Sequence, residues 1–133
     1  GGVVAGTDAG FAYNTFPLMD GALVPADAFA LQPPYRNFFE DVATVQFTHR
    51  LLATLTAIAV LVFWRTARRA APAGRGRLAL EVLAAAVGLQ YALGIATLVM
   101  IVPVPLGVAH QAGAVALWTA ALWGSCELAG WRR

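Results

Sequence analysis

The sequence predicts an all-α protein: a transmembrane helix bundle with three full spans and the end of a fourth. Hydrophobic residues make up 59% of the chain, charged residues make up only 12%, and the mean hydropathy is +0.68. A soluble domain of this composition would be difficult to keep in solution. Three stretches are also long enough to cross a bilayer, which takes about 20 apolar residues in a helix.

The predicted bundle is a single domain in two parts. Residues 1–44 are expected to be the end of a preceding helix and an extracytoplasmic loop, and residues 45–133 to carry the three spans. These spans are expected at about 45–64, 78–102 and 106–131. The chain begins with Gly-Gly-Val-Val and not with Met, so we expect a piece of a longer protein that lacks most of the first helix.

The charged residues are segregated along the chain, and this predicts its orientation. The link between the first two spans carries five arginines and no acid, and the chain ends in two more arginines. By the positive-inside rule both regions lie on the cytoplasmic side. The first and third spans then run in the same direction. Because the net charge of +2 is not gathered into one patch, we expect no binding to nucleic acid.

His49 and His110 are the only histidines, and each lies a few residues inside the outer end of a predicted span. At ~1.5 Å per residue, His49 lies about 6 Å below the end of its helix and His110 about 3 to 6 Å. An ionisable side chain inside a bilayer usually pairs, binds a ligand or lines a polar pathway. Two axial histidines from facing helices can hold a haem iron. A non-covalent haem is the leading hypothesis, because the chain has no CxxCH motif.

Two other interpretations of the histidines stay open. Each imidazole could hydrogen-bond a neighbouring helix or rest at the membrane interface. A zinc site is less favoured, because it usually needs three or four ligands and the outer ends offer no cysteine and no third histidine.

Three segments resemble the carboxy-terminal half of the haem A synthase family, the membrane oxidases of aa3-type cytochrome oxidase assembly. They are AGTDAGFAYNTFPLMDG, VQFTHR and GLQYALGIATLVMIVPVPLGVAHQAGAVAL. The resemblance implies a pseudo-symmetric eight-helix oxidoreductase of two four-helix halves, each with two histidines for one haem. One half takes the substrate haem o, whose ring methyl is oxidised to the formyl group of haem a. The other half holds a haem b cofactor.

The resemblance also assigns the site residues. His49 and His110 match the two axial iron ligands, and Arg50 matches the arginine that follows the first of them. The family's amino-terminal half has a glutamate where this chain has Gln46, so the chain is assigned to the cofactor half. A neutral amide cannot act as a general base, although it can hydrogen-bond a ligand. Gln46 and Gln111 are therefore expected to bind cofactor, and no residue is expected to be catalytic.

Arg50 has two interpretations that the sequence leaves open. Its guanidinium could bind a haem propionate, or it could extend to a lipid phosphate at the interface.

The predicted function is thus the haem b-binding carboxy-terminal half of haem A synthase, inactive alone. The alternatives are a bis-histidine cytochrome b electron-transfer fragment and a haem-free packing or transport bundle. The expected partners are the lipid bilayer, the amino-terminal half with its haem o, haem o synthase, an electron donor and further copies in a homo-oligomer. Arginine in place of every lysine, with abundant alanine, favours a bacterial inner membrane over the alternative, a mitochondrial inner membrane.

Overall fold

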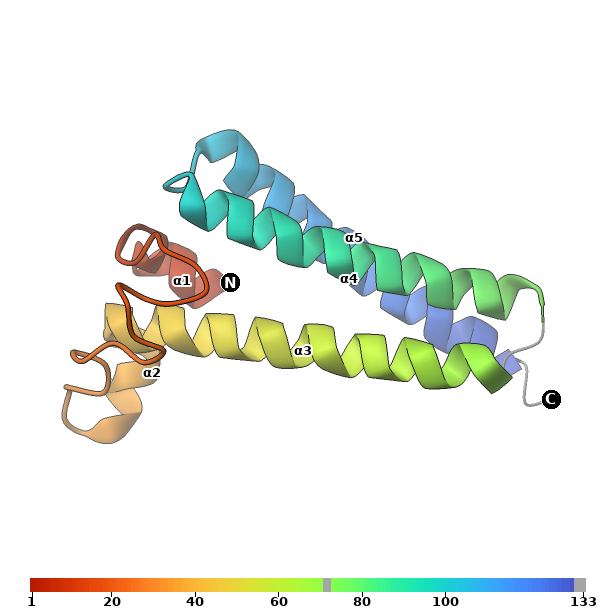
Figure 1. Ribbon diagram of the computed structural model, residues 1–133, viewed down its shortest axis with the longest axis horizontal. Helices are drawn as coiled ribbons and strands as arrows, with labels where there is room; N and C mark the ends of the chain where they lie inside the picture. Colours follow the sequence, from red (N-terminus) through yellow and green to blue (C-terminus); the bar gives the residue numbers. More distant parts are fainter. Residues whose placement is uncertain (71–72, 131–133) are drawn as a thin grey trace.

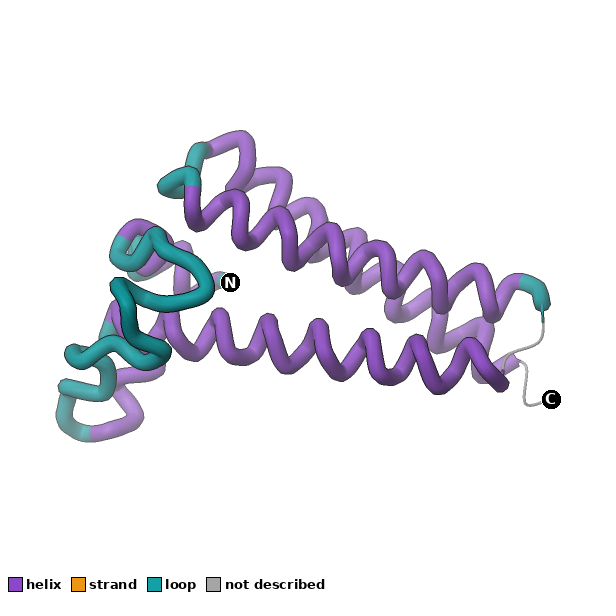
Figure 2. Tube along the Cα trace, in the orientation of Figure 1, coloured by secondary structure: helices purple, strands orange, loops and turns teal. Residues whose placement is uncertain are grey.

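The computed structural model describes residues 1–70 and 73–130, and every regular element within them is a helix (Figure 2). This confirms the all-α prediction. Only an isolated bridge between Met19 and Ala22 interrupts the loops of this described part. In chain order the elements are α1 (Gly2–Gly6), η1 (Ala9–Phe11), η2 (Pro34–Arg36), α2 (Asn37–Glu40), α3 (Val42–Ala70), α4 (Arg75–Val99) and α5 (Val104–Gly130).

The three long helices form an elongated bundle (Figure 1). α4 and α5 lie side by side as an antiparallel hairpin, and α3 packs against α4. α3 and α5 run in the same direction. α3 and α4 are close together at the end where α3 stops and α4 begins, and they diverge toward the other end, where α1 and the following loop lie between them. That divergent end carries both histidines.

Two of the long helices are apolar enough to cross a membrane: α3, with 29 residues and a mean hydropathy of 1.6, and α4, with 25 residues and 1.9. The most apolar window of α3 is 0% buried and that of α4 is 17% buried. The core helix of a soluble protein would instead bury its apolar residues, so these surfaces fit a lipid environment. α5 has 27 residues, but polar residues such as His110 and Glu127 interrupt its apolar sequence, and its span stays a prediction.

The ends of the helices differ from the predicted segments for local reasons. α3 begins at Val42 because the Asp41 side chain accepts a 3.1 Å hydrogen bond from the amide of Thr44, as a helix cap does. α4 ends at Val99 and not at residue 102. Pro103 disfavours helical backbone in the residue before it, and Val102 has a φ of 50°. The predicted third segment ends at residue 131, which lies outside the described residues.

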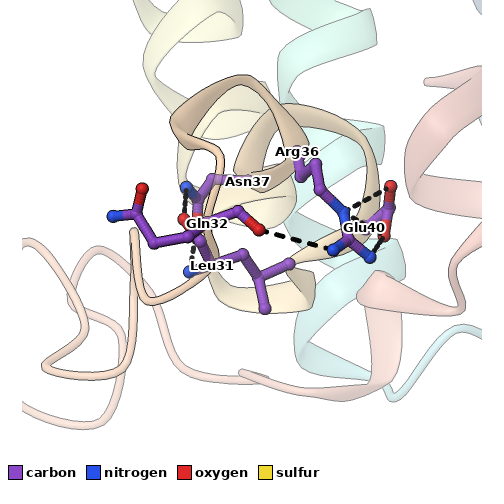
Figure 3. Close-up of polar contacts among 5 residues, drawn as sticks. All are labelled: Leu31, Gln32, Arg36, Asn37 and Glu40. Atoms are coloured by element: carbon purple, nitrogen blue, oxygen red, sulfur yellow. Dashed lines mark hydrogen bonds and ion pairs between the residues drawn. The ribbon is translucent and has the colours of Figure 1, made fainter.

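The loop before α3 is ordered by its own polar side chains (Figure 3). Asn37, only 2% exposed, accepts a 2.8 Å bond from the amide of Leu31 and donates to the carbonyls of Leu31 and Pro34. Arg36 pairs with Glu40 one helical turn further on. These contacts fold the chain back immediately before it enters α3.

Candidate functional site

The two histidines lie at the same end of the bundle, each about two turns from the start of its helix, His49 on α3 and His110 on α5. The His110 ring packs against the backbone of α4 at Gly94. A Cβ atom at that position would lie 3.0 Å from Cε1 of the ring and 3.6 Å from Nε2. With any other residue at position 94, the His110 ring would have to move by a few tenths of an ångström.

Within residues 1–70 and 73–130, neither histidine side chain makes a hydrogen bond of standard geometry. Both residues are half-buried, and Nδ1 of His110 is fully buried without a hydrogen bond. Buried nitrogen atoms without a partner are rare in folded proteins, and each needs an explanation such as a ligand. The two rings are thus available to bind a group that lies between their helices.

Polar contacts between α4 and α5 fix the level of His110. Gln90 on α4 donates a 2.9 Å bond to the backbone carbonyl of His110. A side chain at Gly113 would collide with the Gln90 amide, so this glycine lets the amide lie against α5. Thr97 donates to its own helix at Leu93 and, at 3.3 Å, to Leu106 on α5. The register of the hairpin therefore does not depend on apolar packing alone.

Gln46 and Arg50 are one turn apart on α3 and bind the same loop. Gln46 donates to the carbonyls of Ala9 at 2.7 Å and Tyr13 at 3.2 Å. Arg50 donates to the carbonyls of Tyr13 at 2.6 Å and Thr15 at 2.8 Å, and also to the Gln46 side chain at 3.2 Å. Both predicted site residues thus hold residues 9–15 at the histidine end of the bundle.

These loop contacts do not occupy every hydrogen-bond donor of the Arg50 guanidinium. Its Nε atom is buried and has no partner among the described residues, and a guanidinium has five N–H donors. Gln111, the fifth predicted site residue, is exposed and makes no hydrogen bond to the described residues. The structure therefore brings Gln46, Arg50 and the two histidines to one end; Gln111 lies at the same end, next to His110, but its side chain is exposed.

Four further residues at this end, two in the loop and two on the long helices, connect the loop, α4 and α3. Asn14 donates a 2.9 Å bond to the carbonyl of Leu98. The ring of Phe16 stands edge-on to Tyr91, with centroids 6.3 Å apart. The hydroxyl of Tyr91 in turn shares a 2.8 Å hydrogen bond with Thr54 on α3. Polar residues inside apolar spans were the available signal for Thr54 and Tyr91, but nothing local identifies their partners.

The donor set restricts what the site could hold. Within the described residues, no group of three or more His, Cys, Asp or Glu side chains is placed to bind a metal ion. A structural zinc ion, with four protein ligands, does not fit these residues. A haem iron needs only two axial ligands from the protein. The imidazoles of His49 and His110, at one end of the bundle, supply two such ligands.

Comparison with known proteins supplies the family. The model of the family described as cytochrome oxidase assembly protein matches residues 1–122. A heme A synthase of Nitrosospira multiformis is 53% identical over 128 residues, which cover 96% of this chain and 36% of the relative. A heme A synthase of Rhizobium leguminosarum bv. trifolii is 47% identical, covering 99% and 34%. The human protein named heme A synthase COX15 is 44% identical, covering 96% and 31%.

The chain thus spans about a third of the length of these curated relatives. No solved structure matches it significantly. Because the family model covers nearly the whole sequence, the chain belongs to the cytochrome oxidase assembly protein family that includes the heme A synthases.

Proposed function

We propose that this chain is the haem b-binding part of a haem A synthase, with His49 and His110 as the axial ligands of the iron. One observation carries the proposal: the two imidazoles come from α3 and α5 at the same end of the bundle, and Nδ1 of His110 is buried there without a hydrogen bond of standard geometry to the described residues. The names of the relatives support haem as the ligand. A bound haem b would supply one-electron transfer at this site.

The residues around the histidines would orient the rings and cover the site. Gly94 lets the His110 ring lie against α4, and Gln90 holds the backbone of His110. Gln46 and Arg50 hold the loop of residues 9–15 over this end, and the unused Nε–H of Arg50 can donate to a propionate. Gln46 takes no proton in the reaction, since an amide is not a general base.

The oxidation of a haem o methyl group to the formyl group of haem a belongs, in this proposal, to the whole protein. The part of the protein outside this chain supplies the substrate site, and haem o synthase and an electron donor are its partners. We place the protein in the bacterial plasma membrane. This chain by itself would bind the cofactor without catalysing the oxidation.

The test uses the full-length protein that contains this chain, purified in detergent. Visible spectra of the oxidised and dithionite-reduced protein are recorded for the wild type, His49→Ala and His110→Ala, and extracted haem b is quantified separately. We expect both substitutions to remove the same low-spin b-type signal and to lower the haem b content. His110→Met should retain iron and change the spectrum, because methionine is also an axial haem ligand.

Thr119→Ala is the matched control on α5, because Thr119 is exposed and bonds only to its own helix, at Val115. This variant should keep the wild-type spectrum. If the haem b spectrum and content survive both histidine substitutions in a folded protein, the ligand assignment is wrong.

A further inference from the structure

A second site lies at the other end of the bundle, where α3 stops and α4 begins. A cavity of about 300 Å³ opens there, at the lower end of the range for small-molecule sites. One tryptophan and four arginines line it: Trp64, Arg65, Arg68, Arg69 and Arg77. We propose that this arginine pocket binds the phosphate groups of an anionic phospholipid in the cytoplasmic leaflet.

The charge of the arginine pocket is largely unneutralised. Glu81 bonds with the Trp64 indole at 2.9 Å and with Arg68 at 3.4 Å. The Arg68 guanidinium also lies over the Trp64 ring, 4.7 Å from its centroid. Trp64, Arg68 and Glu81 therefore contact one another, and Glu81 neutralises the charge of Arg68. Among the described residues, the other three arginines of the pocket make no ion pair: Arg65, Arg69 and Arg77.

Arginine is the side chain best suited to a phosphate ligand. Its planar guanidinium donates two parallel hydrogen bonds to phosphate oxygens, whereas lysine acts as a point charge. Arg65 and Arg69 are one turn apart on α3, so they lie on the same face of the helix. Arg77 lines the pocket from α4. Arginines from two helices therefore line one cavity.

A lipid satisfies this surface better than a free phosphate ion does. Tryptophan is enriched at the membrane–water interface, and exposed apolar side chains continue from the pocket along both helices, including Leu61 and Phe63 on α3 and Leu78 on α4. The acyl chains of a lipid can pack along these side chains, whereas a free phosphate ion makes no favourable contact with them. The positive charge of the three arginines without an ion pair also exceeds the single negative charge of one phosphodiester, which favours a lipid with two phosphates.

The lipid proposal does not rest on the haem proposal. His49 and Arg69 are twenty residues apart on α3, which corresponds to ~30 Å along a helix. Haem content therefore reports independently on whether a pocket variant is folded. Failure of lipid binding with intact haem b, or loss of haem b with intact lipid binding, would separate the two proposals.

The experiment is native mass spectrometry of the full-length protein released from detergent. The probes are diphosphatidylglycerol, phosphatidylglycerol, phosphatidylcholine and inorganic phosphate. We expect one diphosphatidylglycerol molecule to bind each chain most tightly. The double variant Arg65→Gln/Arg69→Gln should weaken this binding by about tenfold or more, since each basic residue near a membrane surface contributes appreciably to lipid attraction.

Three further variants make the test specific. Arg75→Gln removes one positive charge from the same end of the bundle outside the pocket, where Arg75 pairs with Glu127, and it should leave binding unchanged, whereas Arg65→Gln alone, which also removes one charge, should weaken it. Arg65→Lys/Arg69→Lys keeps the charge and should still weaken binding several-fold, because the paired donors are lost.

Several results would overturn the lipid assignment. Equal weakening by Arg75→Gln, or full binding by the lysine variant, would mean that general surface charge attracts the lipid. Equal binding of phosphatidylcholine would remove the selectivity. Displacement of the lipid by inorganic phosphate, with the same dependence on the arginines, would mean that the site takes a free anion.

Discussion

Replacing Gln46 with leucine should release the amino-terminal loop from α3. Leucine is close to glutamine in size, so the change removes hydrogen bonds without opening a large cavity. The bonds lost are those from Gln46 to the carbonyls of Ala9 and Tyr13 and the one from Arg50 to the Gln46 oxygen. Gln46 is 2% exposed, so water cannot easily replace them.

The size of the effect follows from these three bonds. A typical intramolecular hydrogen bond contributes about 0.5 to 1.5 kcal/mol net. The 2.7 Å bond to Ala9 belongs near the upper end of that range, and the two 3.2 Å bonds near the lower end. Tyr13 keeps its contact with Arg50, and the Ala9 carbonyl keeps a 3.3 Å bond from the amide of Ala12. We expect a total loss of about 2 kcal/mol, or about 30-fold in the opening equilibrium of the loop.

Hydrogen–deuterium exchange of the full-length protein, read by mass spectrometry, measures this opening. The reporting amides are those of Phe11 and Ala12, which bond to Asp8 and Ala9 within η1. Local opening sets their exchange rate, so exchange of the peptide that contains them should accelerate about 30-fold.

Gln90→Leu is the matched control for this measurement. It removes the same amide from α4, where Gln90 contacts the backbone of His110 and not the loop. Exchange at Phe11 and Ala12 should then stay at the wild-type rate. An unchanged rate in folded Gln46→Leu would refute the conclusion that Gln46 holds the loop.

Three other substitutions follow from the structure. Gly94→Ala would place a Cβ 3.0 Å from the His110 ring, so the ring must shift and, with haem b bound as proposed above, the absorption bands of the full-length protein should move. Asp27 raises the pKa of the Tyr13 phenol to about 12 through a direct hydrogen bond, so Asp27→Asn should lower the pH at which phenolate absorbance appears. Asn37→Ala removes three loop bonds and should speed amide exchange around residue 31 about tenfold or more.

Control variants check the first and third of these predictions, and the direction of the pH dependence checks the second. Gly88→Ala adds a Cβ with no atom within 4 Å and should leave the bands in place; an equal shift would contradict the role of Gly94. Because the Tyr13 pKa is raised from 10.0, its contact with Asp27 stabilises the fold below pH 10.0 and is lost as the pH approaches 12. Gln32→Ala removes an exposed amide side chain from the same loop and should leave exchange around residue 31 unchanged; an equal acceleration would contradict the role of Asn37.

The sequence was sufficient for the fold class and the family. A chain in a bilayer has no water to bond with its backbone and must form its own hydrogen bonds, so long apolar runs predict helices. The resemblance was carried by long joined motifs, and the family comparison confirms it. The helix ends were less predictable, because single contacts such as the Asp41 cap and the backbone restriction before Pro103 decide them.

The sequence predicted where the site residues lie along the helices, but not which groups Gln46 and Arg50 bind. His49 and His110 could be placed at one level from the helical rise alone, and they lie at the same end of the structure. Gln46 and Arg50 were assigned to a cofactor, and the structure has both binding the carbonyls of Ala9, Tyr13 and Thr15. A backbone carbonyl more than 30 positions away leaves no trace in residue type, so no local pattern could predict these bonds.

By itself, the sequence determined that this protein is helical, belongs to one family and carries two histidines at similar helical depth. Those properties follow from composition, motifs and the constant rise of a helix, which are local. Only the tertiary structure decided which groups meet: the His110 ring with Gly94, the loop with Gln46 and Arg50, and the arginines with one another at the far end. These contacts between residues distant in the sequence depend on how the helices pack and rotate, and side-chain contacts across the bundle set that arrangement.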